Sequence, residues 1–296
     1  MKLSVIGVGR VGRAVGLSVI ARGLVDRLVL VGRTPRSAAG DAADLRHASC
    51  CTRPAVVVSG GVPETAGSDV VVLTASAEHV AHDRRATAKP NGELYRQFIK
   101  PLAQASPKAV FIVVTNPVDP LTKLVQDESG LPHGQVLGSG TLLDTLRFRD
   151  LLAERCDVHP RDLRAYVLGE HGDSQVAAIS AASVGGAPLG LPIEEVRELA
   201  DKARMAGQLV AQEKGYTDFG AALATTMIVE AILHDSREVL PVSTRLTDYC
   251  GVSGVCLSVP AVVGRQGVIR TLPIRMNEEE AAAFRASAEL MRGVEC

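Results

Sequence analysis

Residues 3–12, LSVIGVGRVG, decide the fold of this chain, because an apolar run leads directly into three glycines spaced as GxGxxG. The run predicts a buried strand, and the residues after it predict a helix over about 10–22. Gly7 permits the tight turn, Gly9 lets backbone approach a pyrophosphate, and Gly12 allows close packing of helix on strand. The stretch therefore predicts a dinucleotide-binding turn at a helix N-terminus.

The rest of the first half repeats this alternation of strand and helix. Four further runs are β-branched and apolar on both faces, which is typical of parallel strands covered by helices on each side. They are residues 28–32, 55–59, 69–74 and 110–115, with helical patterns at 34–48 and 91–104 between them. We therefore expect an α/β fold with a Rossmann-type, doubly wound parallel sheet over residues 1–141.

The second half, residues 142–296, has a different pattern, typical of an α+β substrate or catalytic domain. We expect helices at 142–155, 194–213, 218–235 and 277–292, a strand at 163–168, small-residue strands near 176–184 and short strands within 239–271. No repeat, low-complexity tract or flexible linker separates the halves, so they should pack as one body.

Composition excludes several classes of partner. The 296 residues carry a net charge of −1 and no Trp, which gives no electrostatic or stacking reason to expect nucleic acid or an anionic membrane. No segment is suited to be a secretory signal or a membrane span. The six cysteines include no CxxC pair, so free thiols and a cytoplasmic location are expected.

The turn after the second strand, VGRTPRS, predicts which dinucleotide is used. An acidic residue at the strand end would bind the adenosine ribose hydroxyls, but here the position is Gly32. Arg33 and Arg36 can pair with a 2′-phosphate, and the hydroxyls of Thr34 and Ser37 can donate to it. NADP(H) is therefore expected and NAD(H) is less favoured; the alternative is a solvated basic turn.

The second half supplies side chains for catalysis. Asp144 and Arg147 are three residues apart on one helix face, and His171 lies in a glycine-flanked loop after a strand. An Asp bound to one imidazole nitrogen would fix the tautomer, so that the other nitrogen can exchange a proton with a carbonyl oxygen. An adjacent arginine could bind a substrate carboxylate through two hydrogen bonds. The alternatives are a surface ion pair and a structural histidine.

Six sequence blocks together resemble the lactate/malate dehydrogenase family over nearly the whole chain. They are GVGRVG (7–12), VVTNPVD (113–119), LDTLRFR (143–149), LGEHGDS (168–174), EKGYT (213–217) and LSVPAVVG (257–264), in family order. GEHGDS together with LDxxRFR is the specific part of this signature.

The resemblance implies a role for each matching residue. His171 would be the acid/base, Asp144 its orienting partner and Arg147 the anchor of the substrate carboxylate. Asn116 would contact the nicotinamide side of the cofactor and the substrate carbonyl, and Thr217 would line the substrate pocket. The full set of expected cofactor contacts is Gly7, Gly9, Arg10, Val11, Gly12, Gly32, Arg33, Thr34, Arg36, Thr74, Ala75 and Asn116.

The family also has a loop that closes over the substrate and brings in an arginine, and this chain departs from its pattern. Within TASAEHVAHDRRATAKPNGELY, either Arg84 or Arg85 fits, and the spacing to the following asparagine favours Arg84. The residue that contacts the far end of the substrate would be Glu78, His79 or Val80. None supplies the cation of the malate enzymes unless His79 is protonated, nor the glutamine of the lactate enzymes. We therefore expect a less common 2-oxo acid with a polar tail.

The sequence predicts an NADP-preferring 2-hydroxy-acid dehydrogenase that works as a 2-oxo-acid reductase. The alternatives are an NAD-dependent malate or lactate dehydrogenase, a nicotinamide-dependent glycosidase, and a nucleotide-binding homologue without catalysis. The resemblance implies a homodimer or homotetramer, with Arg149 and Arg164 as a possible regulatory anion site between subunits. The two histidines of HVAHD have a metal-like spacing, but solvated side chains and no metal are expected.

Overall fold

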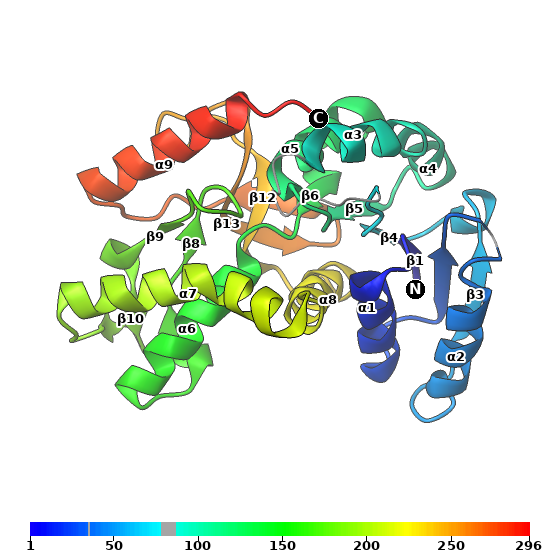
Figure 1. Cartoon of the computed structure of the whole chain (residues 1–296), viewed down its shortest axis with the longest axis horizontal. Coiled ribbons are helices and arrows are strands. Elements are labelled where there is room, and N and C mark those ends of the chain that lie inside the picture. The colour runs from blue at the N-terminus through cyan, green and yellow to red at the C-terminus, as the bar shows by residue number, and fades with distance from the viewer. Residues whose placement is uncertain (35, 78–86) are drawn as a thin grey trace.

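The computed structural model describes residues 1–34, 36–77 and 87–296, and Figure 1 shows how they are arranged. The main sheet of this part of the chain has the strand order β14-β13-β12-β6-β5-β4-β1-β2-β3. Its parallel strands are β1 (Lys2–Ile6), β2 (Arg27–Val31), β3 (Val56–Gly60), β4 (Val70–Leu73), β5 (Val110–Val113) and β6 (Val136–Gly138). The predicted Rossmann-type, doubly wound sheet is therefore confirmed.

Two predicted helices of the first half differ from the structure. α1 (Arg10–Ala21) is as expected, but α2 (Ala39–Ser49) begins later than predicted, because the Ser37 N–H bonds to the Thr34 carbonyl in a turn before the helix. The predicted helix 91–104 is two helices, α3 (Ala88–Arg96) and α4 (Ile99–Ala105). Pro101 lies in the first turn of α4, where its missing N–H is tolerated, whereas one continuous helix would bring its ring against the carbonyl of Gln97.

The second half extends the main sheet and also forms two small sheets of its own. β12 (Glu238–Arg245), β13 (Cys256–Gly264) and β14 (Gly267–Thr271) add antiparallel strands beyond β6, and two of them are longer than the short strands expected. Residues 163–168 are two strands, β7 (Leu163–Arg164) and β8 (Val167–Leu168), which pair in different small sheets. β8 pairs with β9 (Val176–Ala177), and β7 pairs with β10 (Ser183–Val184), which in turn pairs with β11 (Ala187–Pro188).

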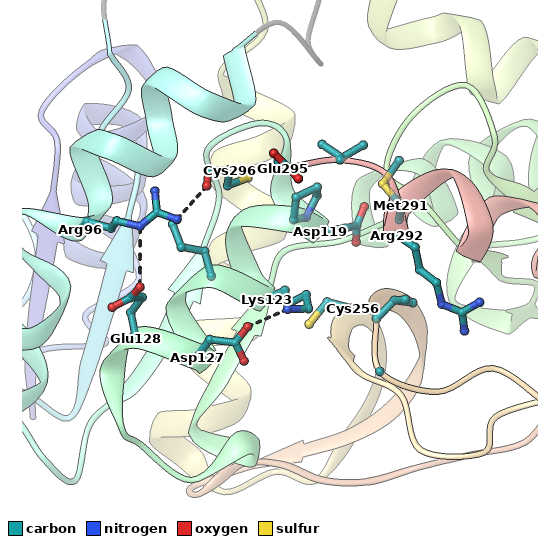
Figure 2. A pocket seen from close by; sticks show the side chains of 15 residues that line it. Arg96, Asp119, Lys123, Asp127, Glu128, Cys256, Met291, Arg292, Glu295 and Cys296 are labelled. Carbon is teal, nitrogen blue, oxygen red and sulfur yellow. Dashed lines mark hydrogen bonds and ion pairs between the residues drawn. The ribbon is translucent and has the colours of Figure 1, made fainter.

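The helices of the second half follow the predicted pattern. They are α6 (Leu142–Cys156), α7 (Ile193–Lys214), α8 (Phe219–His234) and α9 (Glu278–Arg292); α5 (Val118–Ser129) precedes them between β5 and β6. A capping box formed by Asn277 and Glu280 fixes the start of α9. After α9 the chain returns to the first half (Figure 1), where Arg96 Nη2 donates to the main-chain oxygen of Cys296 at 2.8 Å (Figure 2).

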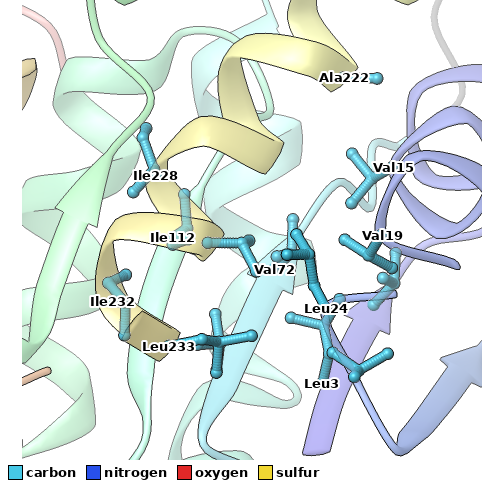
Figure 3. Close-up of a cluster of buried hydrophobic side chains, with 14 of the residues drawn as sticks. Leu3, Val15, Val19, Leu24, Val72, Ile112, Ala222, Ile228, Ile232 and Leu233 are labelled. Atoms are coloured by element: carbon cyan, nitrogen blue, oxygen red, sulfur yellow. The ribbon is translucent and has the colours of Figure 1, made fainter. Parts of the chain in front are cut away.

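One hydrophobic core joins the two halves. Leu3, Val15 and Val19 from the first half pack in the same cluster as Ile228 and Ile232 of α8 (Figure 3). All five side chains are at most 2% exposed, so α8 and α1 bury their apolar faces against each other. The halves therefore pack as one body, as the sequence predicts.

Two further expectations concern the whole chain. All six cysteines are free, as predicted. Among the helices of the described residues, none is long and apolar enough to cross a membrane.

Candidate active site

The glycine turn has the geometry that its three glycines predict. Gly7 has a φ of +99°, and a Cβ there would lie 2.3 Å from the Ala75 nitrogen; a Cβ on Gly12 would lie 2.1 Å from the Gly7 carbonyl oxygen. Thr74 Oγ1 donates to that carbonyl at 2.6 Å and so joins β4 to the turn. At Gly9, by contrast, no described atom lies within 4 Å of a Cβ, which leaves room for a pyrophosphate at the N-terminus of α1.

The two residues that follow Gly9 have different surroundings. The Arg10 guanidinium stacks on the Tyr216 ring at 3.7 Å, which connects α1 to the segment between α7 and α8. Val11 lines the cleft itself. Arg10 was expected only as a cofactor contact; its stacking on Tyr216, beside Thr217, was not predicted.

The turn after β2 is exposed and is closed by its own residues. Ser37 Oγ accepts from the Thr34 backbone N–H at 3.1 Å and donates to the Thr34 carbonyl at 2.7 Å. A Cβ on Gly32 would lie 2.3 Å from Ser37 Oγ, so this hydroxyl occupies the space that an acidic side chain would need. Arg33 and Arg36 are both exposed beside it. The turn therefore places two exposed arginines beside hydroxyls that are hydrogen-bonded within the turn itself.

α6 and the loop after β8 bring the three catalytic candidates together. His171 Nδ1 lies 2.6 Å from Asp144 Oδ2, and Arg147 Nη1 donates to Asp144 Oδ1 at 3.1 Å. Asp144 is only 3% exposed, so burial strengthens both contacts. His171 therefore faces the carboxylate with Nδ1, and both side chains line the same cleft.

The contact between Arg147 and Asp144 was not predicted. α7 packs over the same guanidinium, since a Cβ on Gly207 would lie 3.1 Å from Arg147 Nη1. A glycine inside a long helix is the sequence signal for such a close approach, and it was missed. Arg204 and Gln208 of α7 also line the cleft and were missed as well.

The TNPVD segment connects three loops around the cleft. Thr115 Oγ1 donates to the Ala75 carbonyl at 2.8 Å, and the Asn116 carbonyl accepts from Asn91 Nδ2 at 2.8 Å. Asn91 Oδ1 in turn accepts from the Ala77 N–H at 2.7 Å. Asn91 was used only as a spacing marker in the sequence, yet it ties together the chain on either side of residues 78–86.

Asn116 also offers a group to a ligand. Its Oδ1 is buried and has no hydrogen-bond partner in the described residues, while Asn116 lines the cleft. A buried amide oxygen without a partner costs free energy unless a ligand supplies a donor. The carboxamide of a nicotinamide carries such N–H groups.

These residues share one cleft of about 1070 Å³. Its walls include Val11 and Thr74 beside the glycine turn, together with Asn116, Asp144, Arg147, His171 and Thr217. The expected loop residues Glu78, His79, Val80, Arg84 and Arg85, and the HVAHD histidines, lie outside the described residues. In the ranges 1–34, 36–77 and 87–296, no three His, Cys, Asp or Glu side chains are grouped to hold a metal.

Two other features lie apart from the cleft. A second cavity of about 530 Å³ between α5, β13 and the segment after α9 is lined by Asp119, Lys123 and Cys256, among others (Figure 2). Arg149 Nε donates to the Ala165 carbonyl at 2.9 Å, and burial lowers the pKa of its guanidinium. The regulatory anion site at Arg149 and Arg164 stays a prediction.

The fold and the cleft define a dinucleotide-dependent oxidoreductase. The lactate/malate dehydrogenase NAD-binding domain matches residues 1–138, and the lactate/malate dehydrogenase α/β C-terminal domain matches residues 141–294. The chain therefore belongs to the lactate/malate dehydrogenase family and uses a nicotinamide cofactor.

Curated relatives and solved structures are similar over the whole chain. It is 37% identical to an L-lactate dehydrogenase of Thermoanaerobacter sp. (strain X514), covering 99% of this chain and 97% of the relative. It is 39% identical to an L-lactate dehydrogenase of Synechococcus sp. (strain JA-3-3Ab), with 99% and 98% covered. The crystal structure of the minor L-lactate dehydrogenase from Enterococcus mundtii superposes with a TM-score of 0.94 at 35% identity, covering 99% and 96%.

Proposed function

We propose that this chain reduces a small 2-oxo acid to the 2-hydroxy acid, with NADPH as the preferred reductant. The observation that carries the proposal is the meeting of Asp144, Arg147 and His171 in the cleft that begins at the glycine turn. The names of the relatives, L-lactate dehydrogenases, support the same reaction class. A homologue without catalysis would not need this cluster, and a glycosidase is not favoured by the family match.

Each residue has a task that follows from its geometry. Asp144 holds Nδ1 of His171 and stabilises the imidazolium, so that Nε2 delivers a proton to the carbonyl oxygen. Arg147 keeps N–H groups beyond its bond to Asp144, and these bind the substrate carboxylate. Asn116 Oδ1 orients the cofactor carboxamide. The bound dinucleotide supplies hydride to the carbonyl carbon. In this scheme residues 1–141 hold the cofactor and residues 142–296 the substrate.

The preference for NADPH is supported by the turn after β2. Gly32 removes the acid that would repel a 2′-phosphate, and the Ser37 hydroxyl fills its place. Arg33 and Arg36 supply positive charge beside it. An NAD-dependent enzyme is the second candidate, because the matching domain is described as NAD binding.

The substrate is a 2-oxo acid with a polar tail. The polar side chains of Arg204 and Gln208 on α7 line the cleft beside Arg147 and support such a tail. Pyruvate, the 2-oxo acid that corresponds to lactate, is the second candidate because the relatives are named for lactate.

We also propose a homodimer or homotetramer in the cytoplasm. Among the apolar side chains that are more than half exposed, Leu17 lies on α1, Leu209 on α7, and Phe219 and Leu223 on α8, and α1 packs against α8. A surface of this kind is typical of a subunit interface. The six free cysteines support a reducing compartment.

The test is a panel of 2-oxo acids assayed with NADPH and with NADH. The panel contains pyruvate, oxaloacetate, and 2-oxo acids whose tails carry a hydroxyl or an amine. The proposal expects NADPH oxidation with at least one of them and the highest kcat/KM for a polar tail. A chain that reduces none of them, while still binding NADPH, would contradict the proposed function.

A further inference from the structure

The backbone of the loop that carries His171 is held by three elements that are distant in sequence. The Gly169 N–H donates at 3.0 Å to a carbonyl of β13, and the Glu170 N–H donates at 3.0 Å to Ser287 Oγ of α9. The His171 N–H donates at 2.8 Å to Asp119 Oδ2 of α5. The position of the imidazole therefore depends on three successive backbone anchors.

The third anchor differs from the other two because it is a carboxylate. Asp119 is 2% exposed and lies in the first turn of α5, where the helix N-terminus favours negative charge. A carboxylate accepts an N–H more strongly than a neutral carbonyl or hydroxyl does. The proposed chemistry assigns no other task to Asp119, and a buried carboxylate is costly to keep.

We propose that Asp119 is a positioning residue for His171: its buried carboxylate accepts the His171 backbone N–H and so holds the imidazole against Asp144. Measuring this role through turnover rests on the proposed function, because turnover requires the reduction of a 2-oxo acid. The contact predicts that the strength of the anchor depends on the charge of Asp119.

The surroundings of Asp119 set the pH at which that charge is lost. Burial raises the pKa of Asp119 to about 6, and the nearby Glu170 carboxylate also raises it, while the Ser243 hydroxyl and His171 lower it. Neither Asp119 Oδ1 nor Ser243 Oγ completes a hydrogen bond of ordinary geometry within the described residues. The Cys256 thiol of β13 also faces this carboxylate, and Lys123, one turn further along α5, is bound to Asp127.

Protonation of Asp119 and protonation of His171 should change turnover in opposite directions. In the reductive direction His171 must donate a proton, so protonation of His171 raises turnover as the pH falls. Protonation of Asp119 weakens the acceptor of the His171 N–H, so it lowers turnover over the same range. A decline of kcat below about pH 6 therefore reports Asp119 and opposes the effect of His171 itself.

The experiment compares three variants of the full chain. Asp119→Asn keeps an acceptor oxygen but cannot ionise, Asp119→Ala removes the acceptor, and Asp127→Asn makes the same change at the exposed aspartate of α5. Asp119→Ala should lower kcat by about ten- to hundredfold, the worth of a hydrogen bond to a charged group, with nearly unchanged KM for the cofactor. Asp119→Asn, which keeps a neutral acceptor like the protonated carboxyl, should have a kcat between those of the wild type and Asp119→Ala and should lose the decline at low pH. Asp127→Asn should match the wild type.

A second readout does not depend on activity. Hydrogen exchange of the His171 amide, followed by NMR on protein with isotope-labelled histidine, should be about tenfold or more faster in Asp119→Ala. The increase should be smaller in Asp119→Asn, which keeps a neutral acceptor, and the rate should stay near that of the wild type in Asp127→Asn. If Asp119→Ala does not fold, the proposal is tested by the pH dependence of kcat and the exchange rate of the His171 amide in Asp119→Asn.

Two results would overturn the proposal: unchanged exchange and kcat in folded Asp119→Ala, or a low-pH decline that persists in Asp119→Asn. If the wild type reduces no 2-oxo acid, the proposed function fails while the exchange measurement still tests this contact.

Discussion

The catalytic cluster and the turn after β2 both contain arginine, but the cluster centres on a buried carboxylate that is bonded to a distant loop, whereas the turn is exposed and closed by local hydrogen bonds. Asp144 is buried and bonded to side chains from its own helix and from a distant loop, at 3.1 and 2.6 Å. The turn is exposed, and the hydrogen bonds that close it join Thr34 and Ser37, which are only three residues apart in sequence. Charges in a buried network act strongly on one another, whereas exposed charges are screened by water and salt. Catalysis should therefore be far more sensitive to substitution than cofactor choice.

The strongest test of this contrast is the loss of His171. His171→Ala should lower turnover by about 10²–10⁴-fold, the usual worth of a positioned acid or base, while cofactor affinity is retained. Steady-state kinetics and a fluorescence titration with the dinucleotide measure the two quantities. His133→Ala, an exposed histidine outside the cleft, is the control. Near-normal turnover in His171→Ala would remove the basis for the proposed mechanism.

Arg147→Lys should have the next largest effect. The charge stays, but the planar fork is lost beneath α7, so kcat/KM for the best 2-oxo acid should fall by roughly 10²-fold or more. Arg155→Lys changes an exposed arginine of the same helix, which pairs with Glu195, and should have little effect. An ordinary KM in Arg147→Lys would mean that the substrate carboxylate binds elsewhere.

The ionisation of Asp119 should make the free energy of unfolding depend on pH. Its pKa in the folded state is raised to about 6 from 3.8, so the folded chain binds a proton that the unfolded chain releases between these values. The free energy of unfolding should therefore decrease as the pH rises from about 4 to about 6, by at most about 3 kcal/mol from this group. Denaturant unfolding of Asp119→Asn should lack this decrease.

Asp127 serves as a control, because its effect on the pH dependence of the free energy of unfolding should have the opposite sign. Although burial raises its pKa, hydrogen bonds from Lys123 and Arg245 lower the pKa of Asp127 overall. Its contribution to stability should therefore be lost as the pH falls, and Asp127→Asn should remove that loss. Equal pH slopes in both variants would show that Asp119 does not titrate as described.

Changing the cofactor preference should have the smallest effect and needs more than one substitution. Gly32→Asp alone meets Ser37 Oγ, so Ser37→Ala has to accompany it. Adding Arg33→Ala should lower NADPH use and raise NADH use, each by about ten- to hundredfold. Ser37→Ala alone is the control, and kcat/KM with each cofactor is the measurement. An unchanged preference in the triple variant would place the adenosine end of the cofactor elsewhere.

Much of the fold was readable because local patterns and tertiary contacts agree. Strands β1 to β5 are apolar on both faces, and steric contacts at Gly7 and Gly12 require the absence of a side chain. The antiparallel extension through β12 could not be read, because β12 pairs with β6 across more than a hundred residues. Strand pairing over such a separation leaves no local pattern.

In the site as well, contacts within one element could be predicted from the sequence, whereas contacts between distant elements could not. Asp144 and Arg147 share a helix turn, so their meeting follows from spacing, and the family blocks add His171. The contacts of Asp119 with His171 and of Gly207 with Arg147 join distant elements, so spacing alone could not predict them. Ser37 filling the space beside Gly32 depends on the turn geometry and was likewise not predictable.

The most direct test of the proposed function is the ratio of kcat/KM for NADPH and NADH in the wild-type enzyme, with its best 2-oxo acid and at low ionic strength. If Arg33 and Arg36 pair with the 2′-phosphate, NADPH should be preferred by about tenfold or more. Rising salt should reduce that preference, because an exposed ion pair is screened. An enzyme that uses NADH as well as NADPH, or better, at every salt concentration would contradict the assignment of NADP(H).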